Sequence, residues 1–301
     1  MSVDAPRNFS GYGRRPPDPR WPGGARIAVQ IVLNYEEGGE RCLLDGDAAS
    51  ETHLTDVPGA RAIEGGRDLS VESSFEYGSR AGFWRLHRLL TARRVPVTVF
   101  GVTTALARNP EAVAAMSEAG WEIACHGYRW LDYGRVTEDE ERAHLRAAIE
   151  LHARITGSRP RGWYTGRTSA STRQLVVEEG GFAYDADSYA DDLPYWVRDH
   201  GRPHLVVPYT LDQNDMRLST LPGFGTGREL YEHLVDAFDT LYDEGQSAPK
   251  MMSVGLHGRL AGRPGRAGWV ARFLDHLASK DHVWLCRRIE IAEHWMASHS
   301  P

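Results

Sequence analysis

Cysteine is scarce in this sequence. Only Cys42, Cys125 and Cys286 occur among 301 residues, and no two of them form a CxxC pair. So small and odd a set provides neither a disulfide framework nor a thiolate zinc site, and a reducing cytoplasm is its natural setting. Cys125 directly precedes His126, but neighbouring residues of a strand point to opposite faces. We therefore interpret Cys125 as a core residue rather than a nucleophile.

Long apolar runs and an excess of basic charge are also missing. No stretch reaches the roughly 18 apolar residues of a membrane span, and residues 1–7 lack the apolar run of a secretion signal. The formal net charge is −6, which argues against a general nucleic-acid binder. GxGxxG and Walker patterns are absent as well. We expect a cytoplasmic protein with no membrane partner, no nucleic-acid partner and no cofactor.

What is present is a regular alternation of segments. β-branched apolar runs such as 26–33 alternate about seven times with helical patterns such as 79–93, which predicts parallel strands with helical crossovers. We expect one α/β domain over 25–301, a single distorted (β/α) barrel of about seven parallel strands. A Pro-, Gly- and Arg-rich arm, 1–24, precedes it. Residues 41–78 lack periodicity and predict a long functional excursion.

Reactive polar residues follow three of the predicted strands. Asn34 to Glu37 follow the first, His126 follows a middle one, and His257 follows a late one. Functional side chains of α/β barrels gather at these carboxyl ends of strands. A lone histidine after a strand is more often structural, but three such ends in one barrel favour a site. A carboxylate beside histidines suits general acid–base work on a carbonyl.

Other polar residues are candidates for the pocket. In Arg161 to Thr168, Trp163 and Arg167 could shape a small polar pocket, although Arg167 serves equally well in a surface ion pair. The segment 212–215, which contains Asn214, could add amide or carboxylate contacts. The fourth residue after His126 is Trp130, so the HxxxH spacing of a specific metal site is missing. Spacing alone leaves a His/carboxylate metal site open as the less favoured alternative.

Three of these motifs resemble the polysaccharide deacetylases. LNYEEGGE (33–40) stands where that family carries an Asp-Asp pair, CHGYRW (125–130) where it carries HxxxH, and GLHGR (255–259) where it carries Leu-x-His. The resemblance implies that Glu36 matches the base, that Glu37 and His126 match two metal ligands, and that Trp130 replaces the third. Tyr164 falls where those enzymes carry an arginine, which departs from the family pattern.

The sequence is more similar still to the metal-independent allantoinases. NYEEGGER, EYGSRAG, HGYRW, GWYTGRT, PHLVVPYTLD, NDMR and GLHGRLAGRP carry this similarity, which extends over nearly the whole chain. It implies hydrolysis of the hydantoin ring of (S)-allantoin to allantoate, no metal, and a homotetramer. A hydantoin C–N bond breaks more easily than a simple acetamide, so a base plus hydrogen-bond donors can suffice.

Together these arguments give a set of expected site residues. We expect catalysis by Glu36, His126 and His257. The expected substrate-binding residues are Tyr35, Glu37, Trp130, Trp163, Arg167, Asn214 and Arg259. No residue is assigned to a metal. The alternatives are a metal-dependent deacetylase of N-acetyl sugars, a metal-free hydrolase of another cyclic ureide or imide, and a catalytically silent binding protein.

Overall fold

The computed structural model describes residues 7–301, so the first six residues of the expected arm lie outside the described part. These residues form a nine-stranded sheet in the order β6-β7-β5-β4-β3-β2-β1-β8, with β9 paired to β1 off this path. The strands are β1 (Ile27–Tyr35), β2 (Val97–Gly101), β3 (Glu122–Cys125), β4 (Gly162–Trp163), β5 (Tyr184–Asp185), β6 (Tyr195–Val197), β7 (His204–Val206), β8 (Lys250–His257) and β9 (Val283–Leu285).

Strand β1 pairs with three other strands of the sheet. All nine of its residues are buried, as expected of a strand covered on both faces, and it pairs in parallel with β2, β8 and β9. In the register with β8, Asn34 lies opposite His257. The carboxyl ends of these two strands therefore bring their following residues to one edge of the sheet.

The sheet curls into a barrel that is only partly closed. Every strand pairing is parallel except that of β6 with β7. An isolated parallel bridge between Asn214 and Gly255 ties the segment after β7 to β8. The expected α/β class and distorted barrel of parallel strands are confirmed. The antiparallel edge strand β6 was not expected from the sequence.

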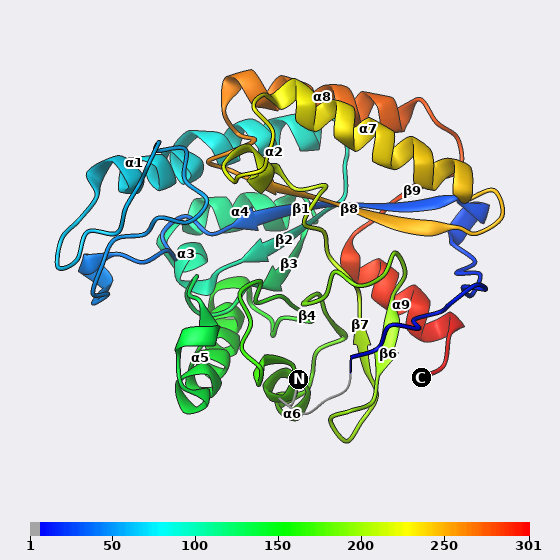
Figure 1. Ribbon diagram of the computed structural model, residues 1–301, viewed down its shortest axis with the longest axis horizontal. Coiled ribbons are helices and arrows are strands. Elements are labelled where there is room, and N and C mark those ends of the chain that lie inside the picture. Colours follow the sequence, from blue (N-terminus) through cyan, green and yellow to red (C-terminus); the bar gives the residue numbers. More distant parts are fainter. Residues whose placement is uncertain (1–6) are drawn as a thin grey trace.

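Helices cover the sheet on both sides (Figure 1). Helices α2, α7 and α8 lie along one side of β1 and β8, while α5 and α6 lie at the opposite end. The helices are α1 (Leu69–Tyr77), α2 (Phe83–Ala92), α3 (Thr103–Arg108), α4 (Pro110–Glu118), α5 (Glu138–Thr156), α6 (Thr172–Glu179), α7 (Gly227–Glu244), α8 (Pro264–Ala278) and α9 (Arg288–Ser298). The short helical turns are η1 (Pro22–Gly24), η2 (Leu43–Asp45), η3 (Gly78–Gly82), η4 (Tyr133–Arg135) and η5 (Asp215–Leu218).

The excursion is shorter than the sequence suggested. Helix α1 occupies the end of 41–78, and the Asp68 carboxylate caps it by accepting the backbone N–H groups of Ser70 and Val71. A π-helical turn, η3, then runs directly into α2. Helix α1 escaped the sequence analysis because its buried stripe is narrow, with Val71 and Phe75 as its large apolar members.

The end of the arm is packed against the barrel. Trp21 is buried, and its indole N–H donates to the Lys250 carbonyl at 2.9 Å. Its ring also contacts the rings of Trp284 and Trp295. None of the helices in residues 7–301 combines the length and the hydropathy that a bilayer-crossing segment needs.

Candidate active site

Glu36 is the centre of the candidate site. It directly follows β1 and is 2% exposed. Its turn is closed by the Gly39 N–H, which donates to the Glu36 carbonyl at 2.8 Å. At Gly39 a Cβ atom would overlap Cγ1 of Val102, so this tight turn requires glycine. The turn directs the Glu36 carboxylate across the edge of the sheet.

His126 approaches Glu36 from the end of β3. Its Nε2 lies 3.2 Å from Oε1 of Glu36, and its Nδ1 lies 3.1 Å from the Tyr164 carbonyl oxygen. The Tyr164 ring packs against the His126 ring, with 4.7 Å between the ring centroids, and it stacks on the Phe100 ring. The strand ends of β3 and β4 thus fix this imidazole.

His257 approaches the same carboxylate oxygen from the end of β8. Its Nε2 lies 3.5 Å from Oε1 of Glu36, and its Nδ1 lies 2.6 Å from Oδ1 of Asp215. All three side chains are almost completely buried. One oxygen of Glu36 therefore faces two imidazoles supplied by different strands.

The partners of His257 determine its charge. Both ring nitrogens face carboxylate oxygens, which only accept hydrogen bonds, and this arrangement favours the imidazolium form, in which both nitrogens donate. Burial disfavours the cation, but the charges of Glu36 and Asp215 outweigh it and raise the pKa of His257 to about 9. At neutral pH His257 is therefore in its protonated form and can act as a proton donor.

Glu36 is held in its ionised form. Burial alone would raise its pKa, but the charges of Arg259 and His257, with hydrogen bonds from both histidines, bring the pKa well below the usual value. Nη2 of Arg259 lies 2.6 Å from Oε2 of Glu36. Oε1 is thus left to the two histidines and to any ligand that enters between them.

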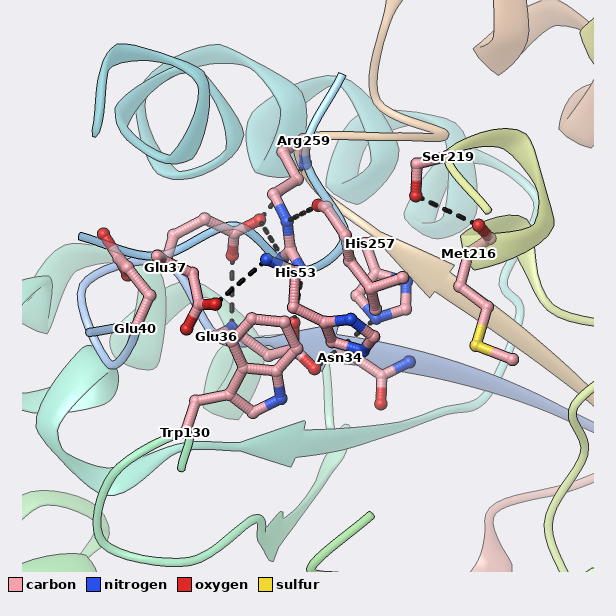
Figure 2. A network of polar contacts seen from close by, with 12 residues as sticks. Asn34, Glu36, Glu37, Glu40, His53, Trp130, Met216, Ser219, His257 and Arg259 are labelled. Atoms are coloured by element: carbon pink, nitrogen blue, oxygen red, sulfur yellow. Dashed lines mark hydrogen bonds and ion pairs between the residues drawn. The ribbon is translucent and has the colours of Figure 1, made fainter. Parts of the chain in front are cut away.

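Glu37 points toward Arg259 (Figure 2). Its Oε1 accepts the Arg259 backbone N–H at 3.1 Å, and its Oε2 accepts the Glu36 backbone N–H at 3.2 Å. Burial, with the charge of Glu36, raises the pKa of Glu37 despite Arg259. Burial also raises the pKa of the neighbouring Glu40 to about 7. Glu37 and Glu40 thus add two carboxyl groups beside Glu36, and Arg259 is the main cation next to them.

Trp130 forms a wall of the site. The guanidinium groups of Arg167 and Arg259 lie 4.4 Å and 5.1 Å from its ring centroid, and the His53 ring lies at 5.5 Å. Arg167 also donates to the Trp130 carbonyl at 2.5 Å. These contacts gather Arg167 and Arg259 at the Trp130 ring, and Arg259 extends from there to Glu36.

Three of the expected substrate-binding residues lie in other surroundings. The Tyr35 hydroxyl contacts Oγ of Ser79, and its ring packs edge-on to Phe83 in the core. Trp163 is buried in a separate apolar cluster, with its indole N–H donating to Thr165. Asn214 caps η5 and forms the bridge to β8. The structure does not bring these three side chains onto Glu36, and their substrate contacts stay predictions.

One residue of the site, His53, was missed by the sequence analysis, and two others had been noted without the contacts that they make. Asp215 belongs to the 212–215 segment, whose polar run was the available signal. His53 comes from the excursion, where no pattern marked it, and it is exposed beside Trp130. Tyr164 was noted as a departure from the deacetylase pattern, and its role is to contact His126. Long-range contacts of this kind have no local sequence signature.

Comparison with known proteins places this geometry in a family. Residues 65–182 match the family model "Polysaccharide deacetylase". A protein of Schizosaccharomyces pombe, described as a candidate polysaccharide deacetylase, is 42% identical over 97% of this chain and 98% of its own length. The chain belongs to the polysaccharide deacetylase family.

Two solved structures of this family are similar over almost their full length. A crystal structure of PuuE allantoinase superposes with a TM-score of 0.97 at 53% identity, covering 99% of this chain and 100% of that one. A polysaccharide deacetylase-like protein from Pseudomonas aeruginosa gives a TM-score of 0.96 at 54% identity, covering 98% and 99%. The resemblance to this family that the motifs suggested is confirmed.

The metal that the deacetylase pattern implies does not fit this polysaccharide deacetylase relative. Glu37, at one ligand position, is occupied by the Arg259 guanidinium and backbone N–H. Trp130, at another, offers only an N–H donor. In residues 7–301 no three His, Cys, Asp or Glu side chains are placed to hold a metal ion. A divalent cation would also meet the charge of Arg259 directly.

Proposed function

We propose that this protein is an allantoinase, a hydrolase that opens the hydantoin ring of (S)-allantoin to give allantoate without a metal ion. The observation that carries the proposal is the convergence of His126 and His257 on Oε1 of Glu36. The near-full-length similarity to PuuE allantoinase supports the choice of substrate class.

The arrangement supplies both halves of an acid–base hydrolysis. Glu36 is ionised and takes a proton from the attacking water, whose oxygen forms a bond to the ring carbonyl carbon. His257, protonated on both nitrogens, donates a proton to the departing ring nitrogen as the C–N bond breaks. His126 is the second donor for the developing oxyanion. The proton taken up by Glu36 then passes to His257, whose Nε2 lies 3.5 Å from its carboxylate, which restores both groups. The net reaction consumes one water and breaks one amide bond.

Arg167 supports recognition of a small polar ring. Its Nε is buried, and no hydrogen-bond partner for it lies within residues 7–301. A substrate carbonyl oxygen that reaches Nε of Arg167 would satisfy this donor, while the stacked indole of Trp130 holds the guanidinium plane in position. The exposed His53 completes this wall from the solvent side.

The wider assignments belong to the same proposal. We propose that residues 25–301 act as one catalytic domain behind the 1–24 arm, in the cytoplasm and as a homotetramer. The three cysteines are all free, which suits a reducing compartment. Exposed apolar side chains on the excursion and α1, at Leu44, Ile63 and Leu69, suit a contact between subunits.

A turnover assay tests the function directly. Purified protein, incubated with excess chelator and then freed of it, is assayed on (S)-allantoin with allantoate as the measured product. We expect full activity before and after chelation. Loss of activity on chelation with recovery on zinc, or release of acetate from an N-acetylglucosamine oligomer without allantoin turnover, would refute the proposal.

A further inference from the structure

Arg259 is the most completely enclosed cation of the site. Its side chain is 0% exposed, and its guanidinium contacts two buried carboxylates. Nη2 lies 2.6 Å from Oε2 of Glu36, and Nη1 lies 3.4 Å from Oε1 of Glu37. The two consecutive acids after β1 therefore share one guanidinium from the turn after β8.

Aromatic rings and a backbone carbonyl fix the guanidinium in place. Its carbon lies 4.4 Å from the Phe75 ring centroid and 5.1 Å from that of Trp130, and Nε donates to the Leu54 carbonyl at 2.9 Å. Such contacts favour arginine over lysine, whose ammonium lacks a planar face and a fixed fork of donors. The side chain has little freedom to swing toward a ligand.

The backbone of Arg259 is fixed as well. Its N–H donates to Glu37, and the preceding Gly258 lies against η3. A Cβ atom at Gly82 would overlap the Gly258 carbonyl oxygen, and one at Gly258 would lie 2.7 Å from the Gly78 carbonyl oxygen. Because Gly82 and Gly258 have no side chains, the π-helical turn η3 packs directly against the turn that carries Arg259 and holds it beside Glu37.

We propose that the Arg259 guanidinium is a built-in cation that takes the place of a metal ion between Glu36 and Glu37. It acts as a positioning residue: it binds Oε2 of Glu36, so that Oε1 alone is presented to His126, His257 and the attacking water. It also neutralises Glu37, which removes the carboxylate that would otherwise attract a divalent cation. This role goes beyond the substrate contact expected for Arg259 from the sequence.

The contrasting explanation is an ordinary buried ion pair that only stabilises the fold. The Arg173–Asp185 pair provides a matched control, since Nε and Nη2 of Arg173 lie 3.1 Å and 3.2 Å from the Asp185 carboxylate oxygens. Both residues of this pair are buried. Removing either arginine leaves a buried carboxylate without its guanidinium and with only histidine side chains as partners, so both variants should lose stability.

The test compares Arg259→Ala, Arg259→Lys and Arg173→Ala with the wild type. Arg259→Ala should lower kcat by about 100-fold with KM changed much less, since a displaced base costs on this scale. Guanidinium chloride, far below denaturing concentrations, should restore its kcat several-fold, while methylammonium should not. The Arg173→Ala enzyme should show no response to guanidinium. Absence of rescue of a folded Arg259→Ala protein would overturn the positioning role.

Arg259→Lys keeps the inference testable if the alanine variant does not fold. The ammonium cannot reproduce the fork between the two acids, so kcat should still fall by about tenfold or more. A lysine variant with wild-type kcat would overturn the proposal.

Cobalt(II) absorption supplies a readout that needs no turnover. Arg259→Ala, or the lysine variant if alanine fails to fold, should gain a visible cobalt spectrum that the wild type lacks. Equal cobalt binding by wild type and variant, whether strong or absent, would overturn the replacement of a metal by Arg259. The kinetic arms rest on the proposed function, and wild-type turnover of allantoin tests that function separately. The cobalt result stands even if allantoin is not the substrate.

Discussion

The carboxylate of Asp215 lies directly behind the imidazole of His257. Its Oδ1 is 2.6 Å from Nδ1 of the ring, and its Oδ2 accepts the backbone N–H groups of His257 and Ala261 at 2.8 Å and 2.9 Å. One buried carboxylate therefore orients the ring, favours its charged form and holds the turn that follows β8.

Replacing Asp215 by Asn should weaken His257 as a proton donor. Without the negative charge, the pKa of His257 falls from about 9, and the alkaline limb of the kcat/KM profile moves to lower pH by about 1 unit or more. We expect kcat to fall on the order of 100-fold. Asp185→Asn is the matched control, because Asp185 also contacts a buried histidine, His204, at 2.9 Å. A profile unchanged in Asp215→Asn would remove this role.

Replacing Glu36 by Gln should abolish most turnover while leaving substrate binding nearly intact. The amide keeps the shape of the side chain but cannot take a proton from water, so a loss of about 100-fold or more in kcat is expected. Binding of allantoin to the variant is measured by calorimetry beside the turnover assay. Turnover close to that of the wild type would rule out Glu36 as the base.

Stability should fall as the pH rises through the range in which His257 loses its proton. A histidine whose folded pKa is raised contributes stability that is complete below its unfolded pKa of about 6.5 and is lost by about 9. The whole effect is on the order of 3 kcal/mol. Burial raises the pKa of Glu40 to about 7, which lowers the stability of the folded state. This loss builds up as the pH rises from the unfolded pKa of Glu40 to about 7 and stays constant above that pH.

Urea unfolding between pH 7.5 and 9.5 distinguishes His257 from Glu40, since Glu40 has finished titrating below this window. Burial also raises the pKa values of the cysteine thiols, which adds the same loss of stability to both proteins, so the difference between them reports His257. The wild type should lose stability steadily, and His257→Asn should show a flatter profile. Equal slopes for the two proteins would contradict the raised pKa of His257.

Adding one methyl group at Gly82 should disturb the site from outside the barrel. A Cβ atom there would overlap the carbonyl oxygen of Gly258, a backbone atom that cannot swing away, so we expect a loss of about 1–3 kcal/mol or more in Gly82→Ala. Gly268→Ala in α8 is the control, because nothing lies within 4 Å of its added Cβ. The control should be neutral or stabilised by about 0.5–1 kcal/mol, since alanine favours helix. Thermal unfolding of both variants provides the measurement, and equal stability would show that the contact yields easily.

The sequence by itself determined the class of fold and the centre of the site. Alternation of buried strands and amphipathic helices predicts a parallel sheet, whose strand ends share one edge, so the sequence alone groups Glu36, His126 and His257. The resemblance of the motifs then supplied the family.

Only the tertiary structure decided which neighbours each of these groups has. The Asp215–His257 pair spans 42 residues and the Arg259–Glu36 pair spans 223, and no local pattern encodes either contact. The side chains of Tyr35 and Trp163, which were expected in the pocket, point into apolar clusters instead. Side chains alternate between the two faces of a strand, and the packing of the sheet decides which face each residue occupies. Charge and pKa depend on burial and on partners distant in sequence, so the ionised Glu36 and the protonated His257 emerged only from the folded chain.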